Sequence, residues 1–193
     1  MKITTWNARG LNAPSKKRLL KRNLTLFDSD IILLQETKLN QEEGLKMKQK
    51  LGKWTSLFQQ SQGASGGLGI IWNPRLINME VLSLQVNWMG MRVTSTKTNL
   101  QLVLINIYGP TSIEDKLSVW NEISSLLNSK PQEIAILGGD FNAVTSLEEK
   151  SGGINQISKV MEGFKNWINK DALLDIKTIN GIYTWNNRRK GEC

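Results

Sequence analysis

Two acidic residues each stand at the end of a short apolar run, in an arrangement typical of a site for phosphate chemistry. Glu36 follows the run at 31–35, and Asp140 follows the run at 134–139. Each run is short enough to be a buried strand, and open α/β sheets place their chemistry where such strands end. Together with Asn7 and Asn142, these carboxylates match the oxygen ligands that Mg²⁺ takes alongside water and substrate phosphate.

The length and composition predict one globular domain over residues 1–193 with no membrane span. Apolar residues make up 39% of the chain and charged residues 22%, and no apolar run reaches 18 residues. The first residues are too polar for a signal peptide. The single cysteine, Cys193, excludes a disulfide framework and a cysteine zinc site, so an intracellular location is expected.

The charge balance favours a polyanionic partner. The chain has 25 Lys and Arg against 17 Asp and Glu, which gives a net charge of +8. Basic residues cluster at 16–22, 46–53 and 188–190; each cluster alone reads as a solvated face, and only their sum points to nucleic acid. The chain contains no histidine, the only side chain with an unperturbed pKa near neutrality.

Hydrophobic periodicity predicts alternating strands and helices around an antiparallel middle. A capping box of Asn40 and Glu43 marks one helix start, and Ser112 caps another. The pattern suggests two sheets packed face to face with helices outside. The predicted helices cover 15–27, 40–52, a segment from 112 to about 127, and 156–170. The predicted strands cover 2–6, 31–35, 54–59, 67–73, 79–86, 90–96, 100–107, 134–138, 174–178 and 182–185.

Six short motifs occur in one order along nearly the whole chain. They are Trp6-Asn7-Ala8-Arg9-Gly10-Leu11-Asn12, Leu34-Gln35-Glu36-Thr37-Lys38, Ser65-Gly66-Gly67, Ile107-Tyr108-Gly109-Pro110, Gly139-Asp140-Phe141-Asn142-Ala143 and Tyr183-Thr184-Trp185. In this order they resemble the endonuclease/exonuclease/phosphatase family, and most closely the apurinic-like endonuclease domain of plant LINE-type (non-LTR) retrotransposons. The resemblance implies a four-layer α/β sandwich of two mixed sheets with helices outside.

The resemblance also implies a role for each site residue. Glu36 resembles the main metal ligand, helped by Asn7, and the expected cation is Mg²⁺ or Mn²⁺. Asp140 resembles the carboxylate that orients or deprotonates the attacking water. Asn7 and Asn142 resemble the amides that hold metal, water and phosphate. The implied reaction is metal-assisted hydrolysis of a phosphodiester.

Two further positions complete the predicted catalytic set. Tyr108 resembles a phenol that reaches toward the scissile phosphate, and Thr184 matches a position among the last contacts of the retrotransposon branch. The glycine-rich segment at 65–69 lacks the Gly-Lys-Ser/Thr ending of a nucleotide-binding loop, so we expect close backbone packing beside the site.

Each residue taken singly also has a structural interpretation. Glu36 could pair with Lys38, and Asp140 could be a turn residue after two glycines. Asn7 could be a turn or cap residue, Tyr108 an aromatic side chain of the core, and Thr184 an ordinary strand threonine. Only the set of motifs together favours the catalytic interpretation.

Two departures from the family pattern lower the expected activity. Several relatives carry an acidic or amide residue that helps to hold metal where this chain has Arg9. The chain ends at 188–193, within the turn after Trp185, before the strands that carry the family's Ser-Asp-His ending. A C-terminally truncated domain that lacks its final strands and catalytic histidine is therefore expected.

The expected function is Mg²⁺-dependent nicking of DNA by a monomeric, nuclear endonuclease domain that is weak or inactive in this form. One alternative is a non-catalytic nucleic-acid-binding remnant. Another is a phospholipid or inositol-phosphate phosphatase of the same fold, against which the basic charge counts.

Overall fold

The computed structural model describes residues 1–26, 28–61, 66–150, 156–176 and 179. The chain divides into two compact units. The first comprises residues 1–109 and 126–140, and the second comprises residues 110–125 and 141–193. A single domain over 1–193 stays a prediction.

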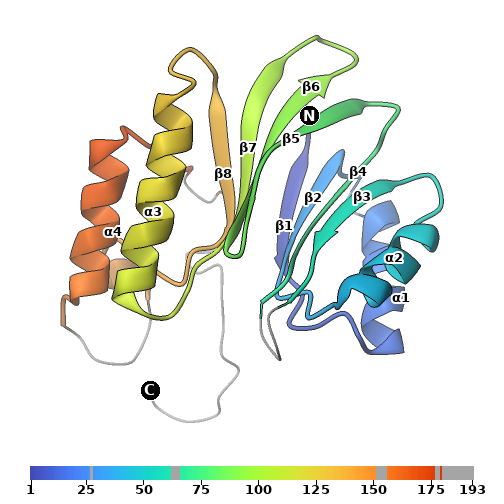
Figure 1. Ribbon diagram of the computed structural model, residues 1–193, viewed down its shortest axis with the longest axis horizontal. Helices are drawn as coiled ribbons and strands as arrows, with labels where there is room; N and C mark the ends of the chain where they lie inside the picture. The colour runs from blue at the N-terminus through green and yellow to red at the C-terminus, as the bar shows by residue number, and fades with distance from the viewer. Residues whose placement is uncertain (27, 62–65, 151–155, 177–178, 180–193) are drawn as a thin grey trace. The chain divides into compact units, whose positions relative to one another are not determined.

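The first sheet of the first unit has four strands in the order β1-β2-β4-β3 (Figure 1). Its strands are β1 (Ile3–Asn7), β2 (Ile31–Gln35), β3 (Thr55–Gln59) and β4 (Leu68–Trp72). β1 and β2 run parallel, whereas β4 is antiparallel to both β2 and β3. The sheet is therefore mixed.

The second sheet also has four strands, in the order β5-β6-β7-β8. Its strands are β5 (Ile77–Gln85), β6 (Trp88–Ser95), β7 (Gln101–Tyr108) and β8 (Ala135–Asp140). The first three form an antiparallel meander, and β8 joins β7 in parallel. The predicted turn at 97–99 joins β6 to β7, and Asn99 there has a φ of 54°.

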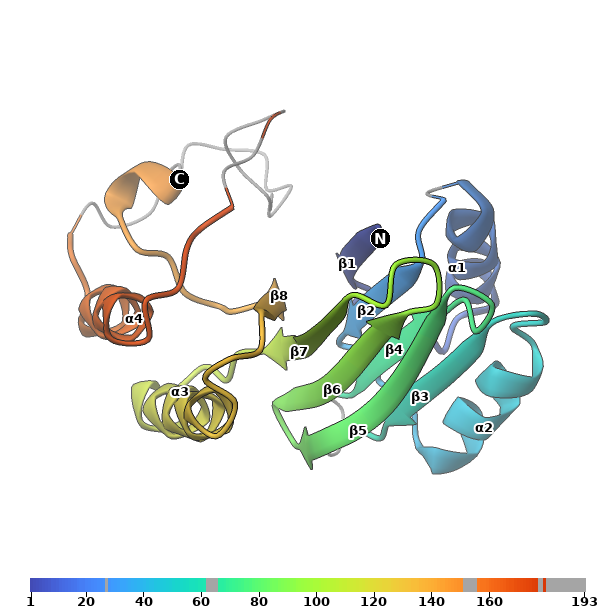
Figure 2. The same cartoon turned by 90° about the horizontal axis from the view of Figure 1, so that it is seen from above.

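Two helices, α1 (Pro14–Leu26) and α2 (Gln41–Gln49), cover the outer face of the first sheet (Figures 1 and 2). Leu20 and Leu24 of α1 and Met47 of α2 share one buried cluster with Ile32 and Leu34 of β2. The predicted capping box is present at the start of α2. Asn40 accepts a hydrogen bond from the backbone of Glu43, whose side chain accepts one from the backbone of Asn40.

The opposite face of the first sheet packs on the second sheet. Ile31 and Leu33 of β2 lie in a buried cluster with Leu102 and Leu104 of β7. β2 is thus covered on both faces, which explains why its first four residues are all apolar. The predicted α/β sandwich of two mixed sheets packed face to face is confirmed.

The second unit holds most of helix α3 (Ile113–Asn128), the short 3₁₀ helix η1 (Leu147–Glu149) and α4 (Lys159–Lys170). As predicted, Ser112 caps α3 and accepts a hydrogen bond of 3.1 Å from the Asp115 backbone. Aromatic side chains join the helices of this unit. The Trp120 and Trp167 rings stack at 5.7 Å between centroids, and Phe164 contacts both.

Some sequence expectations are corrected or lie outside the described residues. The segment at 134–138 was expected to be a buried strand, but β8 is only half-buried and Ile134 is 61% exposed. In the described part of the chain β8 has one neighbour, β7, so it is an edge strand. Residues 174–176 form no strand, and the strand predicted at 182–185 lies outside the described residues. None of the described helices is both long and apolar enough to cross a membrane.

Candidate functional site

Three predicted site residues meet at one point of the first unit. The side-chain amide nitrogen of Asn7 donates hydrogen bonds to Glu36 Oε1 at 2.8 Å and to Asp140 Oδ2 at 2.7 Å. The two carboxylate oxygens therefore lie no farther apart than the sum of these distances. The structure thus brings Asn7, Glu36 and Asp140 together from segments up to 133 residues apart.

The sheet topology explains this convergence. β1 and β2 are parallel with Asn7 opposite Gln35, so the end of β1 lies beside Glu36. β7 and β8 are parallel with Tyr108 opposite Asp140, so these two side chains occupy the end of the second sheet. Parallel strands present their carboxyl ends at the same sheet edge, which is where open α/β sheets bind ligands.

The turn that carries Glu36 has an unusual backbone held by neighbouring loops. Glu36 and Lys38 have φ values of 48° and 53°, in the left-handed region that non-glycine residues seldom adopt. The backbone N–H groups of Thr37 and Lys38 donate to the carbonyls of Gly67 and Gly66 at 3.0 and 3.1 Å. This is the close backbone packing predicted for the glycine-rich segment. Such conformations persist where surrounding structure enforces them, often at functional sites.

Gly139 allows β8 to bring Asp140 to the site. It has a φ of 144°, and a Cβ atom there would lie 2.0 Å from the Ile107 carbonyl oxygen. Only glycine can take this backbone conformation so close to β7. The glycine pair before Asp140 is therefore a requirement of the strand pairing that positions the carboxylate.

Tyr108 ends β7 next to both carboxylates. Burial raises the pKa of Tyr108 above its ordinary value of 10.0, and the charges of Glu36 and Asp140 and a hydrogen bond to Glu36 raise it further. A negative phenolate beside two carboxylates is unfavourable, so the phenol stays neutral and can act as a hydrogen-bond donor.

One cationic side chain that was not predicted as a site residue, that of Lys38, lies beside Glu36. Lys38 Nζ lies 4.0 Å from Glu36 Oε2, and the Arg9 backbone N–H donates to Asn7 Oδ1 at 3.0 Å. The Lys38 side chain is 39% exposed, so this ion pair contributes at most about 1 kcal/mol to stability. The sequence signal for Lys38 was its place in the same short turn as Glu36.

Asn142 and Thr184 are the last two predicted site residues. Asn142 belongs to the second unit, where it is exposed and has a φ of 48°. The Phe141 carbonyl beside it accepts a hydrogen bond of 3.5 Å from the buried Lys116 ammonium. The position of Asn142 relative to Asp140 stays a prediction, and Thr184 lies outside the described residues.

Sequence reasoning also missed two buried polar residues behind the site, Gln35 and Asn106. Both are almost fully buried, and a hydrogen bond of 2.6 Å joins their side chains. Their signal was a polar residue at an inward-facing position of an otherwise apolar strand.

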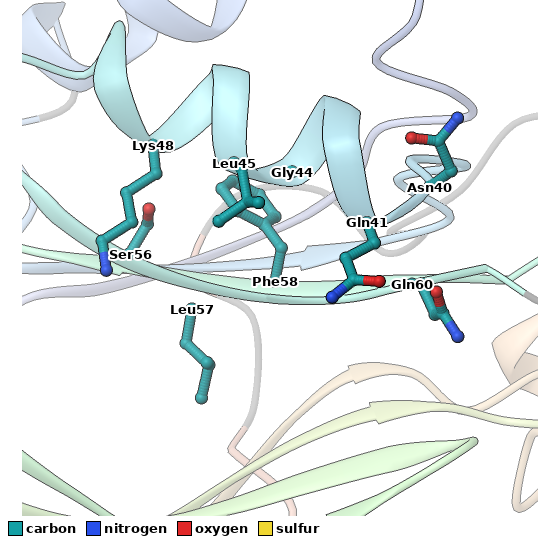
Figure 3. Close-up of a pocket in the computed structure, with 9 residues that line it drawn as sticks. All are labelled: Asn40, Gln41, Gly44, Leu45, Lys48, Ser56, Leu57, Phe58 and Gln60. Carbon is teal, nitrogen blue, oxygen red and sulfur yellow. The ribbon is translucent and has the colours of Figure 1, made fainter.

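A separate groove lies between α2 and β3, with a volume of about 390 Å³. Figure 3 shows Gln41 and Lys48 of α2 pointing toward the strand, where Ser56 lies. Its lining has no acidic side chain, so it lacks the ligands that the strand-end cluster provides.

The donor chemistry of the strand-end cluster suits a hard divalent cation. In the described ranges no group of three or more His, Cys, Asp or Glu side chains could hold a metal ion. Two carboxylates nevertheless suffice for Mg²⁺, which usually binds one or two of them together with water and phosphate. Asn7 turns its nitrogen, not its oxygen, toward the carboxylates, so its role as a ligand stays a prediction.

The chain belongs to the endonuclease/exonuclease/phosphatase family, whose sequence profile matches residues 4–188. Enzymes of this family generally depend on a divalent metal. A comparison with curated proteins finds no match.

Several solved structures share the fold at low sequence identity. The AP endonuclease LMAP from Leishmania major has a TM-score of 0.71 and 14% identity, over 88% of this chain and 66% of that chain. An AP endonuclease from Archaeoglobus fulgidus has a TM-score of 0.64 and 16% identity, over 88% and 70%. The 3′ phosphatase NExo from Neisseria, bound to a product DNA hairpin, has a TM-score of 0.61 and 20% identity, over 88% and 70%.

The chain spans less than two thirds of some of these proteins. It covers 60% of D. rerio TDP2 complexed with a single-strand DNA product, with a TM-score of 0.57, 19% identity and 74% of this chain matched. At these identities the likeness establishes the fold alone.

Proposed function

We propose that this chain carries the metal-binding half of a phosphodiesterase site that acts on DNA. The observation that carries the proposal is the Asn7 amide, hydrogen bonded to two carboxylates from different sheets at the strand ends. Structural roles alone do not require two like charges to be gathered around one amide, because their mutual repulsion is unfavourable. A site that holds a cation explains the arrangement.

The carboxylates of Glu36 and Asp140 would hold Mg²⁺ or Mn²⁺, since carboxylate oxygens suit these cations. When bound, the cation would supply Lewis acidity and neutralise charge on the phosphate oxygens. The remaining catalytic work falls to side chains of the chain itself.

Three side chains have proposed roles in the hydrolysis of the phosphodiester. Asp140 orients a water molecule and accepts its proton as the oxygen attacks phosphorus. Asn7 holds the two carboxylates next to each other through its hydrogen bonds. The neutral phenol of Tyr108 donates a hydrogen bond to a phosphate oxygen. Asn142 is proposed to contribute a second amide contact to the phosphate, as the resemblance implies.

These 193 residues include no imidazole that could support the leaving oxygen. A positioned acid or base is typically worth about 10²–10⁴-fold in rate. We therefore propose that the chain as given cleaves slowly. It should still bind nucleic acid under conditions where cleavage is too slow to measure.

DNA is the proposed substrate for two reasons. The net charge of +8 attracts a polyanion, and two of the matched structures hold DNA. The motif pattern further favours the retrotransposon branch, in which intact duplex is nicked. Supercoiled plasmid and a duplex with one abasic site, compared at equal concentration, test this choice; preference for the abasic duplex would contradict it.

Nicking of supercoiled plasmid in Mg²⁺, with EDTA as blank, tests the activity. Slow, EDTA-sensitive nicking is expected for the natural sequence, and a loss of at least about 100-fold for Asp140→Asn. Glu42→Gln is the matched control, because Glu42 is exposed on α2, where it forms an ion pair with Lys46.

The same preparation distinguishes the non-catalytic alternative. DNA binding that falls steeply with salt, together with nicking that Asp140→Asn leaves unchanged, would mean a binding module with contaminating nuclease. Absence of both binding and nicking would overturn the proposal.

A further inference from the structure

The buried amide of Asn106 links the two sheets behind the carboxylates. Its nitrogen donates to the Leu34 carbonyl of β2 at 3.1 Å and to the Gly69 carbonyl of β4 at 3.0 Å. Its oxygen accepts a bond of 2.6 Å from the side-chain nitrogen of Gln35. Asn106 belongs to β7, so these bonds run from the second sheet to two strands of the first.

The orientation of this amide follows from its partners. Two carbonyl oxygens face one end of Asn106, so that end must be the nitrogen, and the oxygen is left for Gln35. The Gln35 nitrogen also donates to Thr5 Oγ1 of β1 at 3.1 Å. The chain of bonds therefore joins β1, β2, β4 and β7, with Gln35 1% and Asn106 0% exposed.

An apolar residue would fill this position more simply. Leu102 and Leu104 precede Asn106 on the same face of β7 and pack between the sheets. Apolar contacts are non-directional, so they tolerate small sliding of one sheet over the other. A fully bonded amide fixes one register, because any slip leaves buried polar groups unpaired.

The linked strands are those that deliver the site residues. Gln35 directly precedes Glu36, and Tyr108 stands two residues after Asn106 on β7, opposite Asp140 of β8. A shift of β7 relative to β2 would therefore change the separation between the carboxylates of Glu36 and Asp140.

We propose that Asn106 is a positioning residue that sets the distance between the two carboxylates and hence the metal affinity of the site. The inference rests on the proposed function for its metal, whereas its geometric part concerns the metal-free protein. Mutation of groups that orient metal ligands typically costs about 10–100-fold in metal affinity.

The test compares Asn106→Leu with Ile105→Ala in the full 193-residue chain. Ile105 is also fully buried in β7, but it faces away from the first sheet because side chains alternate along a strand. Both variants lose stability. Only Asn106→Leu is expected to weaken Mg²⁺ binding in calorimetry, by about 10–100-fold at a temperature where both are folded.

A second readout needs no metal. The side-chain amide of Asn7 lies between both carboxylates, so its NMR signals, assigned by their loss in Asn7→Ser, report the juxtaposition directly. In Asn106→Leu they should move toward the positions of a free amide, and in Ile105→Ala they should not move.

Each outcome decides the proposal. A folded Asn106→Leu with unchanged Asn7 signals overturns it. If Asn106→Leu does not fold, Gln35→Met removes the bonds of Gln35 to Asn106 and Thr5 but leaves those of Asn106 to Leu34 and Gly69. A smaller shift of the Asn7 signals in the same direction is then expected; no shift overturns the proposal. If the natural sequence binds no Mg²⁺, the metal part of the proposed function fails, while the Asn7 signals still decide the role of Asn106.

Discussion

The two strands that deliver the carboxylates are held very differently. β2 lies between β1 and β4 and every residue of it is buried, and the turn that follows is hydrogen bonded to the glycine-rich segment. β8 has β7 as its one neighbour in the described part of the chain, and all its residues are partly exposed. The backbone of Glu36 therefore follows a strand paired on both sides, whereas that of Asp140 ends a strand paired on one side in the described part of the chain.

This contrast shows where the site is vulnerable. Edge strands open more readily than central ones, because fewer contacts must break. The Asn7 hydrogen bonds join the firmly held carboxylate to the weakly held one. The following predictions test whether the asymmetry controls stability and metal binding.

The largest effect is expected from Gly139→Ala, because Gly139 lies in β8 and contacts β7. The new methyl group would meet the Ile107 carbonyl oxygen at 2.0 Å, in a backbone conformation open essentially to glycine alone. We expect a loss of at least about 3 kcal/mol in the free energy of unfolding, together with loss of Mg²⁺ binding. Urea denaturation measures the first and calorimetry the second.

Gly52→Ala is the matched control for this change. Gly52 also has a positive φ, of 63°, but no atom lies within 4 Å of the added methyl group. It should cost only about 1–2 kcal/mol and leave the site intact. Equal effects of the two substitutions would mean that backbone conformation alone, and not the β7–β8 contact, limits the site.

The next effect concerns the stabilisation that Mg²⁺ gives. A ligand at 100 times its Kd stabilises the native state by about 2.7 kcal/mol. We expect a Tm increase with Mg²⁺ for the natural sequence and none for Glu36→Gln or Asp140→Asn. Each of these variants should be as stable as the parent without metal, or slightly more stable, because it removes one of two neighbouring like charges.

Glu42→Gln should respond to Mg²⁺ like the natural sequence, since Glu42 pairs with Lys46 on α2. A Tm increase that survives both Glu36→Gln and Asp140→Asn would place the cation elsewhere. A response lost in only one variant would show that the two strands contribute unequally to the metal.

A smaller difference is expected in native-state hydrogen exchange. Backbone amides of β2 should exchange only by global unfolding, whereas those of β8 should exchange by local opening. We expect protection at least about 10-fold lower in β8, measured by NMR without metal. Equal protection in the two strands would contradict the inference that β8 opens more readily than β2.

The surroundings of Glu36 could be predicted from the sequence better than those of Asp140. The apolar run at 31–34 and the carboxylate that follows it give the buried strand and its strand-end residue from local pattern alone. The run at 134–139 looks the same, yet its strand has one neighbour in the described part of the chain, because the number of neighbours depends on long-range pairing that no local window contains.

The buried polar contacts were unpredictable for a similar reason. Gln35 and Asn106 are 71 residues apart, and only the packing of one sheet on the other joins their side chains. In α3, helical spacing puts Leu117 on one face with Ile113 and Trp120, yet Leu117 is 45% exposed and Lys116 is buried. The Lys116 ammonium is bonded to main-chain carbonyls, which a hydrophobicity pattern does not register.

The smallest predicted effect is on the titration of Tyr108, which lies between the two strand ends. The raised pKa means that the folded protein holds the phenolic proton more tightly than the unfolded chain does. This contribution to stability is fully present below pH 10, the ordinary pKa of tyrosine, and is lost as the pH rises through the folded pKa.

Tyr183→Phe leaves Tyr108 as the sole tyrosine of the chain, so the absorbance of tyrosinate at alkaline pH reports the titration of Tyr108 alone. Adding Glu36→Gln removes one neighbouring charge and replaces a charged hydrogen-bond acceptor with a weaker neutral one, and should lower the apparent pKa of Tyr108. Asp140→Asn should lower it less, because Asp140 acts by its charge alone and Glu36 by both. A larger decrease with Asp140→Asn would mean that the weakly held carboxylate lies closer to the phenol in solution than Glu36 does.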